Sequence, residues 1–228
     1  MLFREPLRGG DMTTTAEAEP GLGFATRLRT ETAEDHRRAE DMPFAGLLSR
    51  GQVTREQYTT LHGQLFFIYR TLEEAAEAMR NDPVAGPFVH DGLNRVPALR
   101  ADLDQLLGEG WEDGLEPISS VQAYVDRLRA VCFDWPGGFV AHHYLRYMGD
   151  LFGGQIIRTH ISRNLGLNEA TGLSFYTFPA EFASMTFKRG YRELLDTTPF
   201  TESDRNKIVQ EVALGFALNS AMFDQLGR

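Results

Sequence analysis

The sequence predicts an all-α protein with a single domain, and three observations lead to this prediction. First, apolar residues recur in steps of three and four in nearly every periodic segment, as on one face of a helix. Second, no alternating apolar–polar pattern typical of a strand extends beyond a few residues. Third, the interruptions carry glycine and proline and are too short to separate two domains. A chain of 228 residues is long enough for one multi-helix bundle.

The clearest expected helix begins after Thr54. Thr54 and Gln57 form a capping-box pattern, in which each side chain satisfies a backbone N–H at the start of a helix. The apolar face that follows consists of Tyr58, Leu61, Leu65, Ile68, Leu72, Ala75 and Met79. Asn81-Asp82-Pro83 predicts the end of this helix, because proline cannot continue it.

A second clear helix is expected near the C-terminus, where a polar residue, Asn219, interrupts an apolar stripe. The stripe consists of Ile208, Val212, Phe216, Phe223 and Leu226. Further helices are expected over 22–41, 92–107, 118–133, 137–165 and 180–195. Residues 1–20 are rich in Thr, Ala, Glu and Gly and have no apolar periodicity. They predict a disordered tail before one domain over 21–228.

Composition and charge narrow the classes of function. The net charge of -9 disfavours a nucleic-acid-binding role. No stretch of about 18 apolar residues occurs, so no transmembrane helix and no membrane anchor are expected. The single cysteine, Cys132, cannot form an internal disulfide, which suits a reducing cytoplasm. Two local basic clusters are either solvated helix faces or a patch for an anionic ligand or partner: Arg27, Arg29, Arg37 and Arg38, and Lys188, Arg189 and Arg192.

His36 and Glu40 are the first candidate pair for chemistry. They are four residues apart, so on a helix they share a face. A metal-ligating histidine usually donates its other ring N–H to a carboxylate or carbonyl, and this pair could supply both parts. From spacing alone, a surface pair in a charged segment is the competing explanation. His142 and His143 are adjacent, so on a helix they point in different directions and are expected to be structural. No Glu-x-x-His pair of a di-iron bundle and no zinc-binding pattern occurs.

The segment "YMGDLFGGQII", residues 147–157, is unusual for a helix. Each helical glycine costs about 1 kcal/mol relative to alanine, and the segment has Gly149, Gly153 and Gly154. Gly149 and Gly153 fall on one face and leave a strip of bare backbone. Either a partner helix or a planar ligand could approach this strip closely, and paired glycines also favour a kink. Spacing alone leaves both explanations open.

Taken together, these segments resemble the heme oxygenase family. "TETAEDHRRAE" (30–40) is similar to the family's proximal-helix motif, and "VAHHYLRYMGDLFGGQII" (140–157) is similar to its distal-helix motif. "FKRGYRELL" (187–195) and "GFALNSAMF" (215–223) match two further segments. The four matches occur in the family's order over about residues 22–227. The resemblance implies a helical bundle in which heme is sandwiched between a proximal and a kinked distal helix.

The resemblance also implies roles for the residues of both helices. His36 corresponds to the axial ligand of the heme iron, and Glu40 to the acceptor for its other ring nitrogen. Gly149 and Gly153 correspond to the glycines whose backbone lies over the distal heme face, with Gly154 beside them at the bend. Asp150 corresponds to the carboxylate that holds a distal water network. Tyr69 and Arg146 match the hydrogen-bonding positions behind that aspartate.

Further positions match the rim and the wall of the family's pocket. By this resemblance, Arg29, Lys188 and Arg192 are the basic neighbours of the heme propionates, with Tyr144 at the same edge. Phe216 and Asn219 match pocket-lining positions on the last helix. The sequence departs from the family at Phe152, where many members carry serine, and a ring at this position bears on the rate and the regiochemistry.

The implied activity is the oxidative opening of heme to biliverdin, carbon monoxide and ferrous iron. Heme is both substrate and cofactor, O2 is consumed, and electrons come from an external reductant. The resemblance implies a ferredoxin or flavodoxin-type donor, the α isomer of biliverdin, a role in heme degradation and iron acquisition, and a cytoplasmic location. The alternative is a heme-binding carrier or sensor on the same fold. A thiaminase-like relative would need a nucleophilic cysteine, and Cys132 lies away from the matched helices.

Overall fold

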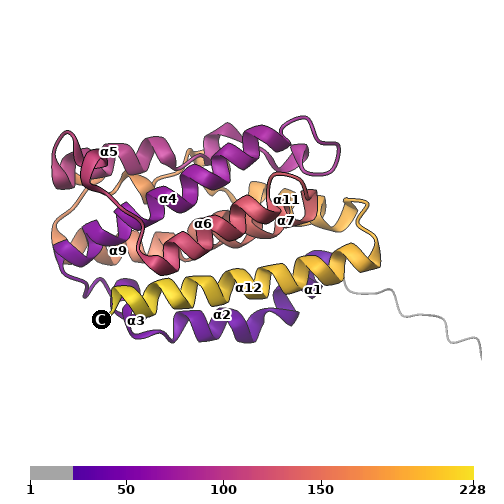
Figure 1. Cartoon of the computed structure of the whole chain (residues 1–228), viewed down its shortest axis with the longest axis horizontal. Coiled ribbons are helices and arrows are strands. Elements are labelled where there is room, and N and C mark those ends of the chain that lie inside the picture. The colour runs from indigo at the N-terminus through magenta and orange to yellow at the C-terminus, as the bar shows by residue number, and fades with distance from the viewer. Residues whose placement is uncertain (1–22) are drawn as a thin grey trace, which may run out of the picture.

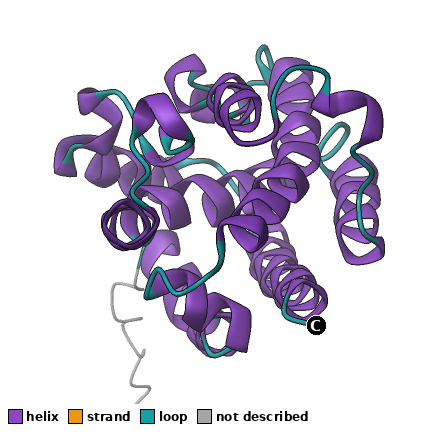
Figure 2. Cartoon of the chain, turned by 90° about the vertical axis from the view of Figure 1, so that its left-hand side faces the viewer, coloured by secondary structure: helices purple, strands orange, loops and turns teal. Residues whose placement is uncertain are grey.

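The computed structural model describes residues 23–228 and shows helices joined by loops, with no strand in that range (Figures 1 and 2). The predicted disordered tail, residues 1–20, lies outside the described residues. The longer helices are α1 (Phe24–Glu31), α2 (Ala33–Glu40), α3 (Pro43–Ser49), α4 (Arg55–Met79), α5 (Val96–Leu107), α6 (Ser119–Val131), α7 (Pro136–His143), α9 (Gly154–Leu165), α11 (Met185–Thr197) and α12 (Glu202–Leu226). The prediction of an all-α fold is confirmed.

Short helical turns complete this part of the chain. They are η1 (Gly86–Phe88), η2 (Asp91–Leu93), η3 (Trp111–Gly114), the π-helical turn η4 (Tyr144–Met148), α8 (Gly149–Phe152), η5 (Glu169–Thr171), η6 (Ser174–Tyr176) and α10 (Ala180–Ala183). Among the helices described, none combines the length and apolar character that crossing a bilayer requires.

The two longest helices of the described chain, α4 and α12, each pack against several other helices of the bundle. α4 begins at the predicted capping box: the Thr54 hydroxyl accepts from the Gln57 N–H at 3.1 Å, and Gln57 Oε1 accepts from the Thr54 N–H at 2.9 Å. α4 packs against α5 and α6, and α12 packs against α2 on one side and α6 and α7 on the other (Figure 1). α12 is therefore the element that contacts both the segment with His36 and the segment that leads to the glycines.

Two expected helices are interrupted by a hydroxyl residue. The expectation of one helix over 22–41 is wrong, because Thr32 separates α1 from α2 and its hydroxyl donates to the Leu28 carbonyl at 2.7 Å. Such local bonds compete with regular helix geometry. The helix expected over 180–195 is interrupted at Ser184, whose extended backbone and hydroxyl cap α11 through the Phe187 N–H. Helix α3 was not predicted from the sequence, although Pro43 at its first position is a typical helix start.

The helix expected over 137–165 is also not continuous. It consists of α7, the π-turn η4, the single turn α8 and then α9, with the break between α8 and α9 at Gly153. We refer to residues 136–165 as the distal segment. π-turns are rare and concentrate at functional sites. The widened turn and the interruption at Gly153, where the dihedrals remain helical, depart from one regular α-helix, and the interruption falls within the unusual glycine stretch.

Candidate functional site

Gly149 and Gly153 form an open strip of backbone on the distal segment. A Cβ atom added to Gly149 would meet no described atom within 4 Å, and one added to Gly153 would meet only the Gly149 carbonyl oxygen, at 3.4 Å. Both glycines are exposed. Close packing against a neighbouring helix therefore does not account for Gly149 within residues 23–228. The strip stays available for a ligand.

Gly154 differs from the other two glycines. It is buried, and a Cβ there would lie 3.1 Å from the Tyr176 ring. Its missing side chain makes room for a tyrosine of the protein. Gly154 therefore faces the interior beside the interruption, whereas Gly149 and Gly153 face outward, and the three glycines do not form one surface.

Asp150 begins a chain of hydrogen bonds that runs into the core. Its carboxylate accepts from the hydroxyl of Tyr69, which projects from α4. The Tyr69 hydroxyl also accepts from Arg146 Nε at 3.2 Å, and Arg146 Nη1 donates to Asn219 Oδ1 at 2.9 Å. The Arg146 guanidinium additionally lies 4.9 Å from the centre of the Tyr69 ring. Three elements, α4, η4 and α12, thus hold one carboxylate next to the glycine strip.

Burial governs the acidities of this chain. It raises the pKa of Asp150, and the Arg146 charge and the Tyr69 hydrogen bond only partly oppose it. Burial likewise raises the pKa of Tyr69 well above its usual range. Burial acts to lower the pKa of Arg146, but the neighbouring Tyr69 and Asp150 outweigh it and the net shift is upward. Arg146 is therefore a fixed cation beside a carboxyl group that gains protons more readily than an exposed aspartate.

Three residues around this chain were not predicted from the sequence: Arg95, Glu73 and Tyr147. Arg95, the residue before α5, donates to the Thr177 carbonyl at 2.7 Å, and its charge opposes the upward shift in the pKa of Asp150. Its own backbone N–H donates to Glu73, and burial raises the pKa of Glu73 to about 7. The Tyr147 ring packs edge-to-face on Tyr69, with centroids 5.8 Å apart. No spacing rule links these residues, because contacts between distant elements bring them together.

His36 and Glu40 lie together on the exposed face of α2. His36 Nδ1 is 3.3 Å from Glu40 Oε2, and both side chains are more than half exposed. Within residues 23–228 no protein group hydrogen-bonds His36 Nε2. The His36 ring is edge-on to Phe216 of α12, with centroids 5.2 Å apart. No three His, Cys, Asp or Glu side chains converge on a point in the described chain, so any metal at His36 would depend on ligands from elsewhere.

α12 brings the His36 side and the Asp150 side to one place. Phe216 and Asn219 are three residues apart and therefore neighbours on the helix surface. Phe216 contacts His36, and Asn219 accepts from Arg146 in the distal segment. α2 and the distal segment thus meet the same turn of α12. This juxtaposition is the centre of the candidate site.

Two basic side chains of α11 gather around Phe152. Lys188 is buried, its Nζ donates to the Leu151 carbonyl at 2.7 Å, and it lies 4.3 Å from the centre of the Phe152 ring. Arg192 Cζ lies 5.3 Å from the same centre. Burial raises the pKa of Tyr144, and the charges of Arg192 and Arg29 oppose this rise.

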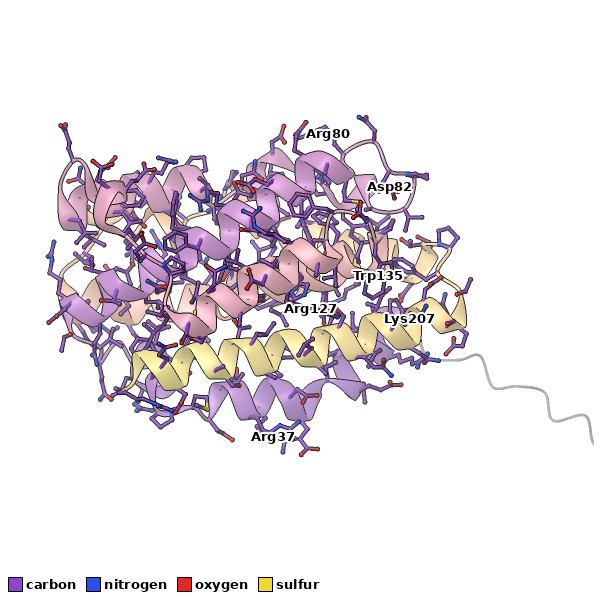
Figure 3. All side chains as sticks on the ribbon, in the orientation of Figure 1. Arg37, Arg80, Asp82, Arg127, Trp135 and Lys207 are labelled. Carbon is purple, nitrogen blue, oxygen red and sulfur yellow. The ribbon has the colours of Figure 1, made fainter. Side chains whose placement is uncertain are left out.

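The N-terminal basic residues do not act as one patch. Arg27 pairs with Glu31 and with Glu202, and Arg38 pairs with Glu34 and Asp35. Arg37 projects from α2 away from the rest of the molecule (Figure 3). Arg29 is exposed and forms no ion pair with the described residues. The interpretation as solvated charge therefore fits most of the cluster and leaves Arg29 available.

The adjacent histidines of α7 are buried parts of the scaffold. Figure 3 labels Arg127 on α6, which pairs with Glu211 of α12, and His142 Nε2 lies 2.9 Å from the same carboxylate. His143 Nδ1 lies 2.8 Å from the Tyr191 hydroxyl. The expectation that His142 and His143 are structural is confirmed.

Cys132 is also part of the scaffold. It is fully buried, and burial raises the pKa of its thiol. A reactive cysteine needs an accessible, electropositive environment that favours the thiolate. Cys132 therefore lacks the environment of a nucleophile, which argues against a thiaminase-like activity.

Comparison with known proteins identifies relatives of the same fold. The heme oxygenase family profile matches residues 22–225. The heme oxygenases of Guillardia theta and Pyropia yezoensis are 33% and 35% identical over 203 residues, which is 89% of this chain and 86% and 85% of those proteins. The structure of heme oxygenase-1 from the cyanobacterium Synechocystis sp. PCC6803 in complex with heme superposes with a TM-score of 0.84. It is 33% identical, with 90% of this chain and 92% of that chain covered.

The chain therefore belongs to the heme oxygenase family. It is an oxidoreductase that degrades heme to biliverdin with O2 and a reductant, and heme is its substrate as well as its cofactor. A carrier or sensor without turnover is not the function that this membership indicates.

Proposed function

We propose that heme binds between α2 and the distal segment, where His36 Nε2 would hold the heme iron. The support is that Nε2 has no hydrogen-bond partner among the described residues while Nδ1 faces Glu40, which would hold the neutral tautomer that a metal ligand needs. The edge-on Phe216 restricts the rotation of the imidazole ring. When bound, heme supplies the iron at which O2 is activated.

The backbone of Gly149 and Gly153 would lie over the opposite face of the ring. The observation that carries this proposal is the open strip, where an added Cβ at Gly149 meets nothing of the described protein. A flat ring can approach bare backbone more closely than it can approach side chains. The strip would also leave space for O2 on one side of the ring and so direct oxidation toward one edge. We propose that the product is the α isomer of biliverdin.

Asp150 would govern the proton in this pocket. One carboxylate oxygen accepts from Tyr69, which leaves the other to order a water molecule toward the strip. The raised pKa of Asp150 fits a group that accepts and returns a proton more readily than an exposed aspartate does. Tyr69, Arg146 and Asn219 would hold the carboxylate in place, and Asn219 would also line the pocket together with Phe216.

Arg29, Tyr144, Lys188 and Arg192 would bind the heme propionates. They come from α1, η4 and α11, and the charges of Arg192 and Arg29 both lower the pKa of Tyr144 against the rise from burial, which supports their grouping at one edge. We further propose that an acidic ferredoxin or flavodoxin-type protein supplies electrons at this basic edge. We also propose that residues 21–228 form a single heme oxygenase domain. The protein would act in the cytoplasm, in heme degradation for iron acquisition.

The direct test is to mix the protein with hemin and follow the visible spectrum during reduction by ascorbate or a ferredoxin system. Loss of the Soret band with growth of a biliverdin band is expected, and chromatography of the product against the four biliverdin isomers tests the α assignment. A stable Soret band under both reductants would contradict the proposal of turnover at this site. Comparing ferredoxin with flavodoxin as the sole electron source tests the donor.

A further inference from the structure

Phe152 is the residue of the glycine segment to which the proposed function assigns no role. It lies on α8 directly before Gly153, and its side chain is 41% exposed. Its ring contacts two cations of α11: Lys188 Nζ lies 4.3 Å and Arg192 Cζ 5.3 Å from the ring centre. Both distances are within the range of cation–π attraction, about 6 Å.

Lys188 and Arg192 are held together against their mutual repulsion. They are four residues apart and so share one side of α11. Burial lowers the pKa of Lys188, and the charge of Arg192 lowers it further, which shows that the two charges oppose each other. The negative ring face of Phe152 and the Leu151 carbonyl, which accepts from Lys188 Nζ at 2.7 Å, offset this repulsion. Consecutive residues of α8 thus fix both cations beside the glycine strip.

These contacts leave hydrogen-bond donors of both cations for a ligand. An ammonium group has three N–H donors, and Lys188 uses one on Leu151. A guanidinium stacked on a ring keeps its N–H edge available for a carboxylate. The two cations can therefore bind anions without leaving Phe152.

We propose that Phe152 is a positioning residue that holds Lys188 and Arg192 in the arrangement that receives the heme propionates. The proposal rests on the proposed function, which assigns those two cations to the propionates. Without the ring, two long side chains that repel each other would have to be ordered when heme binds, and this ordering weakens affinity. Phe152 would also keep the propionate edge of the heme facing α11, and hence fix the in-plane orientation of the heme.

The experiment compares Phe152→Leu, which removes the ring face, with the matched control Phe152→Tyr, which keeps it. Each variant and the wild type are titrated with hemin and with hemin dimethyl ester, which lacks the propionate charges, by following the Soret band. We expect Phe152→Leu to weaken hemin binding by about five- to tenfold. We expect its affinity for the ester to change by less than about twofold, because no propionate charge is then involved. Phe152→Tyr should resemble the wild type with both ligands.

Two further measurements separate positioning from a general structural effect. Thermal unfolding of the ligand-free proteins should be similar for all three, because the side chain is exposed. The heme-methyl resonances in the NMR spectrum of the ferric complex should show a second in-plane orientation only in Phe152→Leu. An unchanged preference for hemin over the ester in Phe152→Leu, or an equal loss for both ligands, would overturn the proposal.

The failure of the proposed function has a different signature. If the wild type binds hemin and the ester equally well, the propionate assignment itself is wrong, and the role of Phe152 falls with it. If the wild type prefers hemin while Phe152→Leu keeps that preference, only the inference about Phe152 is wrong.

Discussion

At the scale of single residues, the site combines an exposed histidine with a partly buried carboxyl group. His36 contacts Glu40 on its own helix and Phe216 on α12, and no described residue hydrogen-bonds its Nε2. Asp150 is held by a chain of residues from three elements, and burial raises its pKa. Replacing either residue should therefore have a distinct outcome.

His36→Ala should lose the spectrum of a histidine-ligated heme and most of the turnover, while the pocket still traps some heme. The reason is that the other contacts to the ring do not depend on the imidazole. Visible spectra of the hemin complex and biliverdin yield measure the two effects. His90→Ala, outside the candidate site, is the control. A His36→Ala protein with an unchanged heme spectrum and full activity would refute the ligand assignment.

Asp150→Ala should keep heme but lower the biliverdin yield by about 100-fold, the usual size of a lost proton-transfer group. Peroxide would instead be consumed in peroxidase-like reactions, because proton delivery to the strip is no longer ordered. Product chromatography and the oxidation of guaiacol by peroxide measure the two paths. Asp126→Asn, an exposed carboxylate on α6, serves as the control. Undiminished biliverdin production in Asp150→Ala would rule out the proton-delivery role.

At the scale of elements, the distal segment departs from regular α-helix geometry at the candidate site. The π-turn η4, the single turn α8 and the break at Gly153 all occur between residues 144 and 153. A continuous helix would satisfy the backbone more regularly, so the irregularity has to be stabilised by the surroundings. Arg146 supplies part of that support through its hydrogen bond to Asn219 of α12. Tyr176 supplies another part, because its ring packs beside Gly154.

Gly149→Ala tests whether the strip serves the ligand or the fold. A Cβ at this position meets nothing of the described protein and the backbone is helical, so the unfolding free energy should rise by about 0.5–1 kcal/mol. Heme turnover should nevertheless fall, since the methyl group enters the strip. Urea denaturation and the hemin assay measure the two changes.

Gly190→Ala on α11 is the matched control, because an added Cβ there also meets nothing within 4 Å. It should give the same gain in stability with turnover unchanged. A Gly149→Ala protein that is stabilised and fully active would show that the bare backbone is not needed for the reaction.

At the scale of the whole molecule, buried histidines connect the stability of the bundle to pH. Burial lowers the pKa of His143 to about 3, and the neighbouring His90 lowers it further. Between about pH 6.5 and 3, this histidine therefore binds a proton in the unfolded chain but not in the folded chain. The stability that His143 contributes is present above about pH 6.5 and is lost as the pH falls from 6.5 toward 3.

His143→Asn should remove this dependence while keeping a polar partner for Tyr191. Between about pH 6 and 4, the unfolding free energy of the wild type should fall more steeply than that of the variant, by about 1 kcal/mol per pH unit. Urea denaturation at a series of pH values measures both slopes. Comparing the slopes cancels the opposite contribution of Glu73, whose pKa is raised. Parallel slopes would show that His143 does not titrate as its burial implies.

Local sequence was enough to predict the fold class and the frame of the molecule. Helical periodicity and capping are local properties, so α4 and α12 and the capping box at Thr54 could be predicted from neighbours a few residues apart. The pairing of His36 with Glu40 followed from the same spacing rule. The resemblance of four segments to one family then indicated the activity and the candidate residues.

How these residues meet depends on tertiary packing. The Tyr69–Asp150 and Arg146–Asn219 hydrogen bonds join residues more than 70 positions apart, and no local pattern encodes such contacts. The same holds for the separation of Gly154 from the open strip and for the cations around Phe152. Spacing along the chain fixes which residues share a face, because a helix has a fixed period. Whether that face is filled, open or charged is determined by distant elements that pack against it.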